Sequence, residues 1–352
     1  MVSWQLGQPV AELLSGITMS LLKFSAKPNT LESEMAERFD VSVGFATLYL
    51  EKVFPSADRR SAFSSWWSSL TEAAQFYVSY AMDTNNRGTD VAGRFLSREG
   101  VPQTGRHLDV GSGYGGTSVA FAKRGFETIA VETHPAFAAY TRANTASYNV
   151  KVYEDDFSLM DISKLGYFDV ITCNEVLEHV YDPPLVIKRL CSLLSPSGVL
   201  MMEVPNWRCL SFIPQDGHYL QFGLTLLPRH EAKELRGALT GDYDYDGMGE
   251  YYDIDYYYNL LRAGGLTVGK HHSHIIGNED SAPQYIESIM SSYRAWLAND
   301  KVPYFLRHSL QIRLDKYLSK FFADSAHARV SQDWEPFREK YLTSFWAFYA
   351  QK

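Results

Sequence analysis

A glycine-rich turn preceded by a carboxylate is the segment of this chain whose residue types could best bind a ligand. It contains Asp109 and the run Gly111-Ser112-Gly113-Tyr114-Gly115-Gly116, between a predicted strand over 106–110 and a predicted helix over 116–124. Glycines suit such a turn because they let a ligand approach the backbone, which a Cβ would block. Their spacing alone also fits a dinucleotide. Asp109 favours a different ligand, because its carboxylate would repel a pyrophosphate but attract an amino-acid group that carries a positive sulfonium.

Polar side chains also end the next three predicted strands. Glu132 ends the second strand, at a distance along the chain that suits a carboxylate accepting ribose hydroxyls. The third strand is followed by Asp155-Asp156-Phe157, in which a carboxylate and a ring could contact the edge and face of an adenine. The fourth ends at Asn174-Glu175. Because the carboxyl ends of parallel strands form one rim, we expect these groups to surround a single pocket.

The pattern of apolar residues changes near residue 100. Before it, the spacing is that of helices, interrupted at Pro55 and over the polar stretch 83–88. After it, short apolar runs alternate with helical patterns, which is typical of a parallel sheet covered by helices. The predicted strands cover 106–110, 127–132, 149–154, 168–173, 198–204, 266–274 and 344–351. The predicted helices between them cover 116–124, 135–146, 183–194 and 253–264.

These patterns predict an α/β fold with two regions. Residues 1–100 form an N-terminal helical region, which we expect to act as a lid or substrate region, and residues 101–352 form the core. Two segments, 207–250 and 277–340, do not fit the alternation and are interpreted as largely helical insertions. Long insertions at the loop end of a sheet often determine specificity.

Composition limits the class of protein. The 352 residues carry a net charge of −8 without a dense Lys/Arg run, which argues against nucleic acid as a partner. No apolar run approaches the roughly 20 residues needed to cross a bilayer, and residues 1–23 lack the pattern of a signal peptide. The three cysteines lack metal-finger spacing. We therefore expect a cytoplasmic protein that acts on a small molecule, and the sequence predicts no oligomeric state.

Residues 106–206 resemble the class I S-adenosylmethionine-dependent methyltransferases, nearest to the branch of the ubiquinone-biosynthesis O-methyltransferases. The matching pieces are the turn after Asp109, Val131-Glu132, Asp156-Phe157, the run 168–180, and Glu203-Val204-Pro205-Asn206. The resemblance implies a Rossmann-like, seven-stranded sheet with an antiparallel last strand and S-adenosylmethionine as the cofactor. It assigns the methionine part to Asp109, Gly111, Ser112, Gly113 and Gly115, the ribose to Glu132 and the adenine to Asp156.

Glu175, Glu178 and His179 could form a metal site. On a helical turn these positions share a face, and the spacing resembles the divalent-metal site of ubiquinone-biosynthesis and small-RNA 2′-O-methyltransferases. In the latter a further histidine follows a Pro-Asn strand end, which corresponds here to His218. Two carboxylates and two imidazoles could hold a divalent metal such as Mg²⁺ and orient a hydroxylated acceptor. Alternatively, Glu178 and His179 only cap and pack the turn.

The acceptor side offers several imidazoles and no nucleophile motif. Methyl transfer mainly requires alignment, with a base where the acceptor starts protonated. His179, His218 and His230 are candidates for that base, although a single histidine is more often structural. We favour methyl transfer to an oxygen of a small molecule. The alternatives are an NAD-dependent oxidoreductase, for which Asp109 is unfavourable and a Tyr-x-x-x-Lys motif is missing, and a non-catalytic cofactor-binding protein.

Overall fold

The computed structural model describes residues 30–245 and 247–352, without the side chains of residues 270–273. The first 29 residues, which hold the segment tested for a signal peptide and the start of the predicted helical region, lie outside the described residues. The chain divides into two compact units. The first unit contains Ser112–Glu154 and the chain up to Glu99, and the second unit contains Gly100–Gly111 and Asp155–Lys352.

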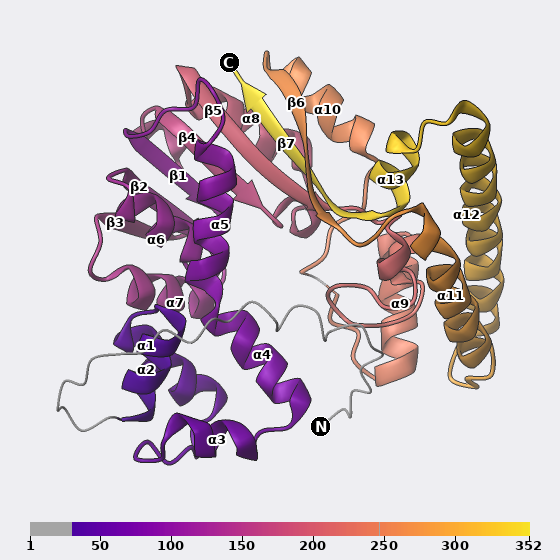
Figure 1. The fold of residues 1–352 in the computed structure, drawn as a ribbon, viewed down its shortest axis with the longest axis horizontal. Helices are drawn as coiled ribbons and strands as arrows, with labels where there is room; N and C mark the ends of the chain where they lie inside the picture. The colour runs from indigo at the N-terminus through magenta and orange to yellow at the C-terminus, as the bar shows by residue number, and fades with distance from the viewer. Residues whose placement is uncertain (1–29, 246) are drawn as a thin grey trace. The chain divides into compact units, whose positions relative to one another are not determined.

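The strands belong to one seven-stranded sheet with the order β3-β2-β1-β4-β5-β7-β6 (Figure 1). Their bounds are Arg106–Val110 (β1), Glu127–Glu132 (β2), Val150–Glu154 (β3), Phe168–Asn174 (β4), Leu194–Pro205 (β5), Thr267–Ile275 (β6) and Thr343–Gln351 (β7). Parallel pairs join β2 to β3, β1 to β4 and β4 to β5, whereas β7 is antiparallel to both β5 and β6. The predicted α/β fold with an antiparallel last strand is therefore confirmed. Strand β5 begins four residues earlier than expected, with an irregular register opposite Phe168.

Among the described residues, seven α-helices belong to the first unit. They are Leu31–Phe39 (α1), Val43–Val53 (α2), Phe63–Ser69 (α3), Glu72–Met82 (α4), Thr84–Leu96 (α5), Gly116–Lys123 (α6) and Pro135–Thr145 (α7). Side-chain oxygens of Thr30, Ser42 and Thr71 cap the N-termini of α1, α2 and α4. Helices α1 to α4 enclose an apolar cluster around Phe45, to which Tyr140 of α7 also belongs.

The polar stretch 83–88, predicted as an interruption, instead begins helix α5. The reason is a close approach of α5 to α6 that no local pattern reveals. A Cβ on Gly88 would lie 2.2 Å from the carbonyl carbon of Gly116, and one on Gly116 would lie 2.0 Å from the carbonyl oxygen of Thr84. Asn85 is buried and bonded to Asn144 of α7, where the Nδ2 of Asn144 donates to its Oδ1 at 2.8 Å. Tertiary packing therefore outweighs the weak helix propensity of Gly88 and Asn85.

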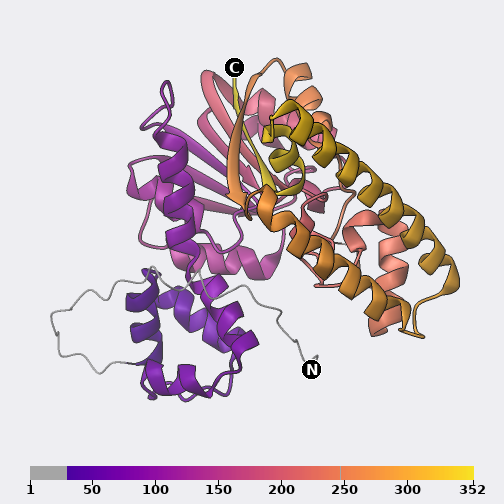
Figure 2. The same cartoon turned by 45° about the vertical axis from the view of Figure 1, so that its right-hand side comes forward.

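Six α-helices of the described part of the chain belong to the second unit. They are Pro183–Leu193 (α8), Arg229–Thr240 (α9), Ile254–Ala263 (α10), Ala282–Leu297 (α11), Tyr304–Ser331 (α12) and Glu335–Tyr341 (α13). Helices α9, α11 and α12 lie beside one another, away from the sheet, in both ribbon views (Figure 2). Their buried apolar residues form one cluster, which includes Leu235, Trp296 and Leu310. The segments 207–250 and 277–340 thus bury their apolar faces against each other.

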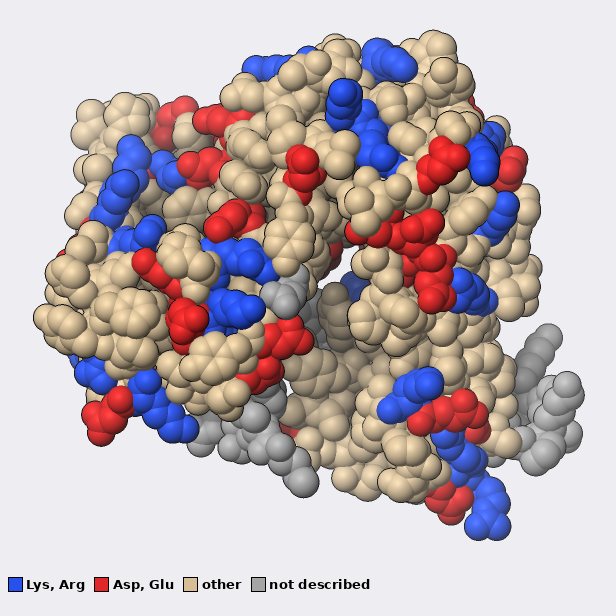
Figure 3. Space-filling model, turned by 180° about the vertical axis from the view of Figure 1, so that it is seen from behind, with Lys and Arg blue, Asp and Glu red and all other residues tan. Residues whose placement is uncertain are grey.

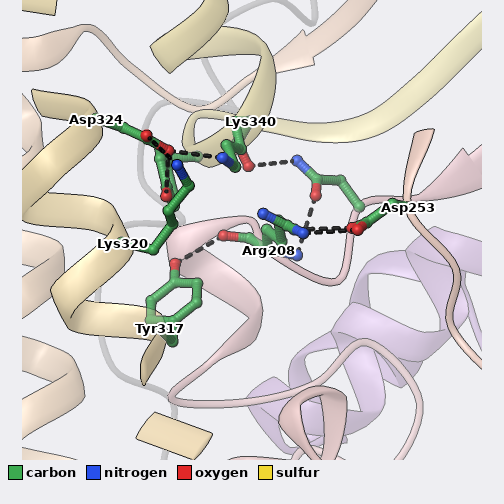
Figure 4. Close-up of polar contacts among 8 residues, drawn as sticks. Arg208, Asp253, Tyr317, Lys320, Asp324 and Lys340 are labelled. Atoms are coloured by element: carbon green, nitrogen blue, oxygen red, sulfur yellow. Dashed lines mark hydrogen bonds and ion pairs between the residues drawn. The ribbon is translucent and has the colours of Figure 1, made fainter. Parts of the chain in front are cut away.

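Polar contacts hold the chain where it leaves β5 (Figure 4). Arg208 donates to the two carboxylate oxygens of Asp253 at 2.8 and 2.6 Å, and its carbonyl oxygen accepts the hydroxyl of Tyr317 at 2.7 Å. Nearby, Asp324 of α12 pairs with Lys340 of α13 at 2.6 Å. These contacts attach the start of the 207–250 segment to α12 and to the cap of α10.

The surface carries charges of both signs. On the face shown in Figure 3, the Lys and Arg side chains of the described residues are interspersed with Asp and Glu. Among these residues no helix, including the 28-residue α12, is long and apolar enough to cross a membrane. That nucleic acid is not a partner stays a prediction.

His107 of β1 should make the stability of the fold depend on pH. Its side chain is fully buried, and burial lowers its pKa to about 3. In the unfolded chain the imidazole would titrate near pH 6.5, so between these values the unfolded state binds more protons than the folded state. Above about pH 6.5 the imidazole is neutral in both states and costs no stability. As the pH falls below that value, this group lowers the free energy of unfolding by up to roughly 1.4 kcal/mol per pH unit.

Urea denaturation of the wild type and of His107→Gln at pH 7.5 and pH 5 would measure this contribution. The variant should lose less stability on acidification, because glutamine does not titrate. Equal losses in both proteins would contradict the assignment.

Candidate active site

In the first unit, Glu132 at the end of β2 organises the glycine-rich turn. Its Oε2 accepts the backbone N–H of Gly113 at 2.8 Å, and its Oε1 accepts that of His134 at 2.9 Å. The side chain is buried, yet each carboxylate oxygen can accept more than one hydrogen bond. Glu132 can therefore shape the turn and still bind hydroxyl groups of a ligand.

Helix α7 holds the same turn from its other side. The hydroxyl of Thr141 donates to the carbonyl oxygen of Gly113 at 2.8 Å and lies 3.1 Å from the hydroxyl of Ser112. Gly115 has a φ of +81°, and a Cβ there would lie 3.1 Å from the Cα of Thr141. Asn144 of α7 donates to the carbonyl oxygen of Tyr114 at 3.0 Å. The turn is thus set before any ligand binds.

In the second unit, Asp109 is the last residue but one of β1, and Gly111 directly follows the strand. Asp109 is 4% exposed and accepts the hydroxyl of Thr172, on the neighbouring strand β4, at 2.9 Å. Gly111 has a φ of +73°, and a Cβ there would lie 2.3 Å from the Cγ2 of Val176. Glycine is therefore required at this position both for its backbone angle and for the close approach of the chain after β4.

Asp156 and Phe157, which follow β3, already make contacts within the protein. Asp156 accepts the backbone N–H and the hydroxyl of Ser158 at 2.8 and 2.6 Å, which closes a tight turn. Phe157 is buried, with the guanidinium of Arg189 5.6 Å from its ring centre. Part of the ring predicted to face an adenine is therefore already in contact with protein.

Strand β4 ends in a strained turn. Asn174 has a buried Oδ1 with no hydrogen-bond partner, which marks an acceptor that a ligand could satisfy. Glu175 has a φ of +56°, an uncommon value for a residue with a side chain, and donates its N–H to the carbonyl oxygen of Glu203 at 2.9 Å. Backbone strain of this kind clusters at functional sites.

Three of the four predicted metal ligands come together after this turn. Glu178, His179 and His218 each offer a ligand atom, and these atoms lie within 4.8 Å of one another. The Nε2 of His179 lies 3.9 Å from the Oε1 of Glu178, and the two imidazole rings are 4.9 Å apart. Glu175 is not in this group, because the helical turn begins only at Leu177, as a 3-10 helix.

Part of the chain matches a known protein family. Residues 82–271, more than half of the chain, match the family described as "Methyltransferase domain". The chain belongs to the methyltransferase domain family. The resemblance to class I methyltransferases, inferred from the motifs between residues 106 and 206, is thereby confirmed.

Individual relatives match this chain over a shorter length. The ubiquinone biosynthesis O-methyltransferase of Xanthomonas axonopodis pv. citri is 34% identical over 114 residues, 32% of this chain and 48% of that protein. That of Xanthomonas campestris pv. campestris is 36% identical over 106 residues, 29% and 43% of the two chains. The chain thus spans less than half the length of these curated relatives. The solved structure of a SAM-dependent methyltransferase from Archaeoglobus fulgidus is 12% identical, with a TM-score of 0.45, and covers 80% of this chain and 100% of that one.

Electrostatics distinguish the group of Glu178, His179 and His218 from a simple cap. Glu178 is 2% exposed and its Oε2 has no hydrogen-bond partner. Burial, together with the nearby Glu175, raises its pKa well above the usual value. Burial and the neighbouring His179 lower the pKa of His218 to about 4. A buried carboxyl with one oxygen that makes no hydrogen bond, beside a neutral imidazole, is costly unless a ligand compensates it, which is the behaviour of a binding site.

The surroundings orient both imidazoles. Nδ1 of His179 lies 2.6 Å from the carbonyl oxygen of Gly247, so this nitrogen carries the proton and Nε2 faces Glu178. Nδ1 of His218 lies 3.3 Å from the hydroxyl of Tyr251. The loop that carries His218 is fixed by Asp216, which accepts the N–H of His218 at 2.9 Å. The sequence analysis did not name Asp216 as a functional residue, although an aspartate two positions before His218 signals such a turn.

The third candidate base, His230, lies elsewhere. It is exposed at the second position of α9 and is not part of the three-residue group. Its neighbour Arg229 donates to the hydroxyl of Tyr181 at 2.7 Å, and Tyr219 stacks on Tyr245 with ring centres 5.0 Å apart. Of the three histidines, only His179 and His218 are adjacent.

Proposed function

We propose that this protein transfers the methyl group of S-adenosylmethionine to an oxygen atom of a small-molecule acceptor. The observation that carries the proposal is the group of Glu178, His179 and His218 directly after β4. A hydroxyl acceptor must lose its proton to become a good nucleophile, and His218 is neutral above about pH 4, so it can take that proton. The name of the Xanthomonas relatives also includes O-methylation.

The cofactor contacts in this proposal are those predicted from the sequence. Support comes from the pre-formed turn around Gly113, from the buried carboxylates of Asp109 and Glu132, and from the unsatisfied Oδ1 of Asn174. The full set assigned to S-adenosylmethionine is Asp109, Gly111, Ser112, Gly113, Gly115, Glu132, Asp156, Phe157 and Asn174.

A divalent metal at the three-residue group is an alternative to the role of His218 as the base, because an imidazole nitrogen bound to a metal cannot take a proton. The Oε2 of Glu178 lacks a hydrogen-bond partner, and the Nδ1–H of His179 donates to a carbonyl oxygen, as metal-bound histidines usually do. One carboxylate and two imidazoles favour Zn²⁺ or Fe²⁺ over Mg²⁺, which prefers oxygen ligands. A bound ion would act as a Lewis acid toward a hydroxylated acceptor.

Acceptor specificity is assigned to the segments outside the sheet. His218 lies in the 207–250 segment and Tyr251 directly follows it. We therefore propose that this segment contacts the acceptor. A lid over the acceptor, formed by residues 1–100 and the segments 207–250 and 277–340, belongs to the same proposal. A cytoplasmic setting is also proposed, since Cys173, Cys191 and Cys209 form no disulfide.

Calorimetric titration with S-adenosylmethionine, S-adenosylhomocysteine and NAD tests the cofactor. Micromolar binding of the first two without binding of NAD is expected. Binding of NAD alone would replace the proposal by an oxidoreductase. Binding of S-adenosylmethionine without formation of S-adenosylhomocysteine on a panel of phenols, catechols, amines and thiols would indicate a non-catalytic binding protein.

Replacing the imidazole of His218 should slow the chemical step. We expect His218→Asn to lower kcat toward hydroxylated acceptors by about 100-fold or more, because general-base catalysis contributes on that order. The dissociation constant of S-adenosylmethionine should not change. His230→Asn, in an exposed histidine of the same segment, serves as the matched control and should keep kcat within about twofold. Equal activity of both variants would exclude His218 as the base.

A further inference from the structure

Three buried polar side chains, those of His107, Thr172 and Asp109, form a hydrogen-bonded chain between strands β1 and β4. Asp109 and Thr172 are directly opposite each other in the parallel register of the two strands. The hydroxyl of Thr172 lies 2.9 Å from the Oδ1 of Asp109 and also 2.9 Å from the Nε2 of His107. His107 and Thr172 are fully buried, and Asp109 is nearly so. Residues two apart on a strand share a face, which places His107 beside Asp109.

The chemistry of these groups sets the direction of both hydrogen bonds. A carboxylate only accepts, so the single hydroxyl proton of Thr172 is donated to Asp109. The threonine oxygen must then accept from His107, whose Nε2 therefore carries a proton. Burial keeps this imidazole neutral, with a pKa of about 3. The hydrogen bonds thus run in one direction, from the imidazole N–H to the hydroxyl and from the hydroxyl to the carboxylate, which only accepts.

We propose that Thr172, oriented by His107, is a positioning residue that holds the Asp109 carboxylate in the plane required by the ammonium group of the cofactor's methionine part. This inference rests on the proposed function, because it takes Asp109 as the residue that meets that group. A donor on Oδ1 restricts rotation of the carboxylate about its last torsion. Because the donor is in place before binding, little orientational freedom remains to be lost when the cofactor arrives.

The alternative is that these hydrogen bonds only join the two strands. A cofactor fragment separates the two roles, since 5′-methylthioadenosine keeps the adenosine and sulfur but lacks the ammonium and carboxylate groups. A positioning role predicts that loss of the hydroxyl weakens binding of S-adenosylhomocysteine and leaves binding of 5′-methylthioadenosine unchanged. Damage to the sheet would weaken both.

The experiment is calorimetric titration of Thr172→Val and Thr172→Ser with these two ligands. Valine keeps the shape of threonine without its hydroxyl, and we expect about tenfold weaker binding of S-adenosylhomocysteine, the effect of one buried hydrogen bond to a charged group. Serine keeps the hydroxyl and should bind like the wild type. Unchanged S-adenosylhomocysteine binding by Thr172→Val, or an equal loss for both ligands, would overturn the inference.

A second pair of variants covers the case in which Thr172→Val does not fold. His107→Gln keeps an N–H donor near the position of Nε2 and should bind S-adenosylhomocysteine normally, whereas His107→Leu should bind it several-fold more weakly, with normal 5′-methylthioadenosine binding. Equal binding by these two variants would count against the inference.

Asp109→Asn separates this inference from the proposed function. If this variant binds S-adenosylhomocysteine like the wild type, the proposed cofactor site itself is wrong. If it binds weakly while Thr172→Val binds normally, only the positioning role fails.

Discussion

Glu132→Ala is expected to weaken binding of S-adenosylmethionine by about 100-fold, roughly 3 kcal/mol. Two effects add. The variant loses the carboxylate proposed to accept the ribose hydroxyls, and it leaves the backbone N–H groups of Gly113 and His134 without their acceptor. The glycine-rich turn is then no longer held before binding, so its ordering becomes part of the cost of binding.

Calorimetry with S-adenosylmethionine on the purified variant measures this loss. Glu132→Gln keeps one acceptor oxygen and should fall between the wild type and the alanine variant. Glu127→Ala, at the exposed start of the same strand, is the matched control and should bind normally. A folded Glu132→Ala protein with wild-type affinity would remove the basis for the cofactor site.

Gly88→Ala is expected to destabilise the protein strongly, because helix α5 has no room for a methyl group at this position. The added Cβ would lie 2.2 Å from backbone atoms of Gly116, which cannot move as a flexible side chain could, so the two helices must separate. We expect a loss of about 3 kcal/mol in the free energy of unfolding. Because Gly116 begins α6 directly after the glycine-rich turn, affinity for S-adenosylmethionine should fall as well.

Gly93→Ala provides a control in the same helix. A Cβ there meets no atom within 4 Å, and alanine favours helix over glycine by roughly 1 kcal/mol, so this variant should be slightly more stable than the wild type. Thermal denaturation of the two variants measures the difference. Similar melting temperatures for Gly88→Ala and Gly93→Ala would show that α5 and α6 do not touch at these glycines.

The sequence by itself determined the sheet, the family and the residues nearest the glycine-rich turn. The spacing of apolar residues along β1, β2 and β4 is a local property, since it follows from the repeat of each element, and it predicted strand bounds within a residue or so. The carboxylates of Asp109 and Glu132 could be named for a similar reason. In a parallel sheet, the end of a strand fixes the edge at which its last side chain lies.

Only the tertiary structure decided which distant groups meet. Helix α5 begins in a polar stretch because Gly88 fits against Gly116. Glu175 lies outside the group of Glu178, His179 and His218 because the helical turn begins only at Leu177. The same holds for Thr172, which meets both His107 and Asp109 through the register of two strands. Such contacts depend on how complete elements pack and on which loops return to the sheet. No spacing within a single stretch of sequence encodes that information.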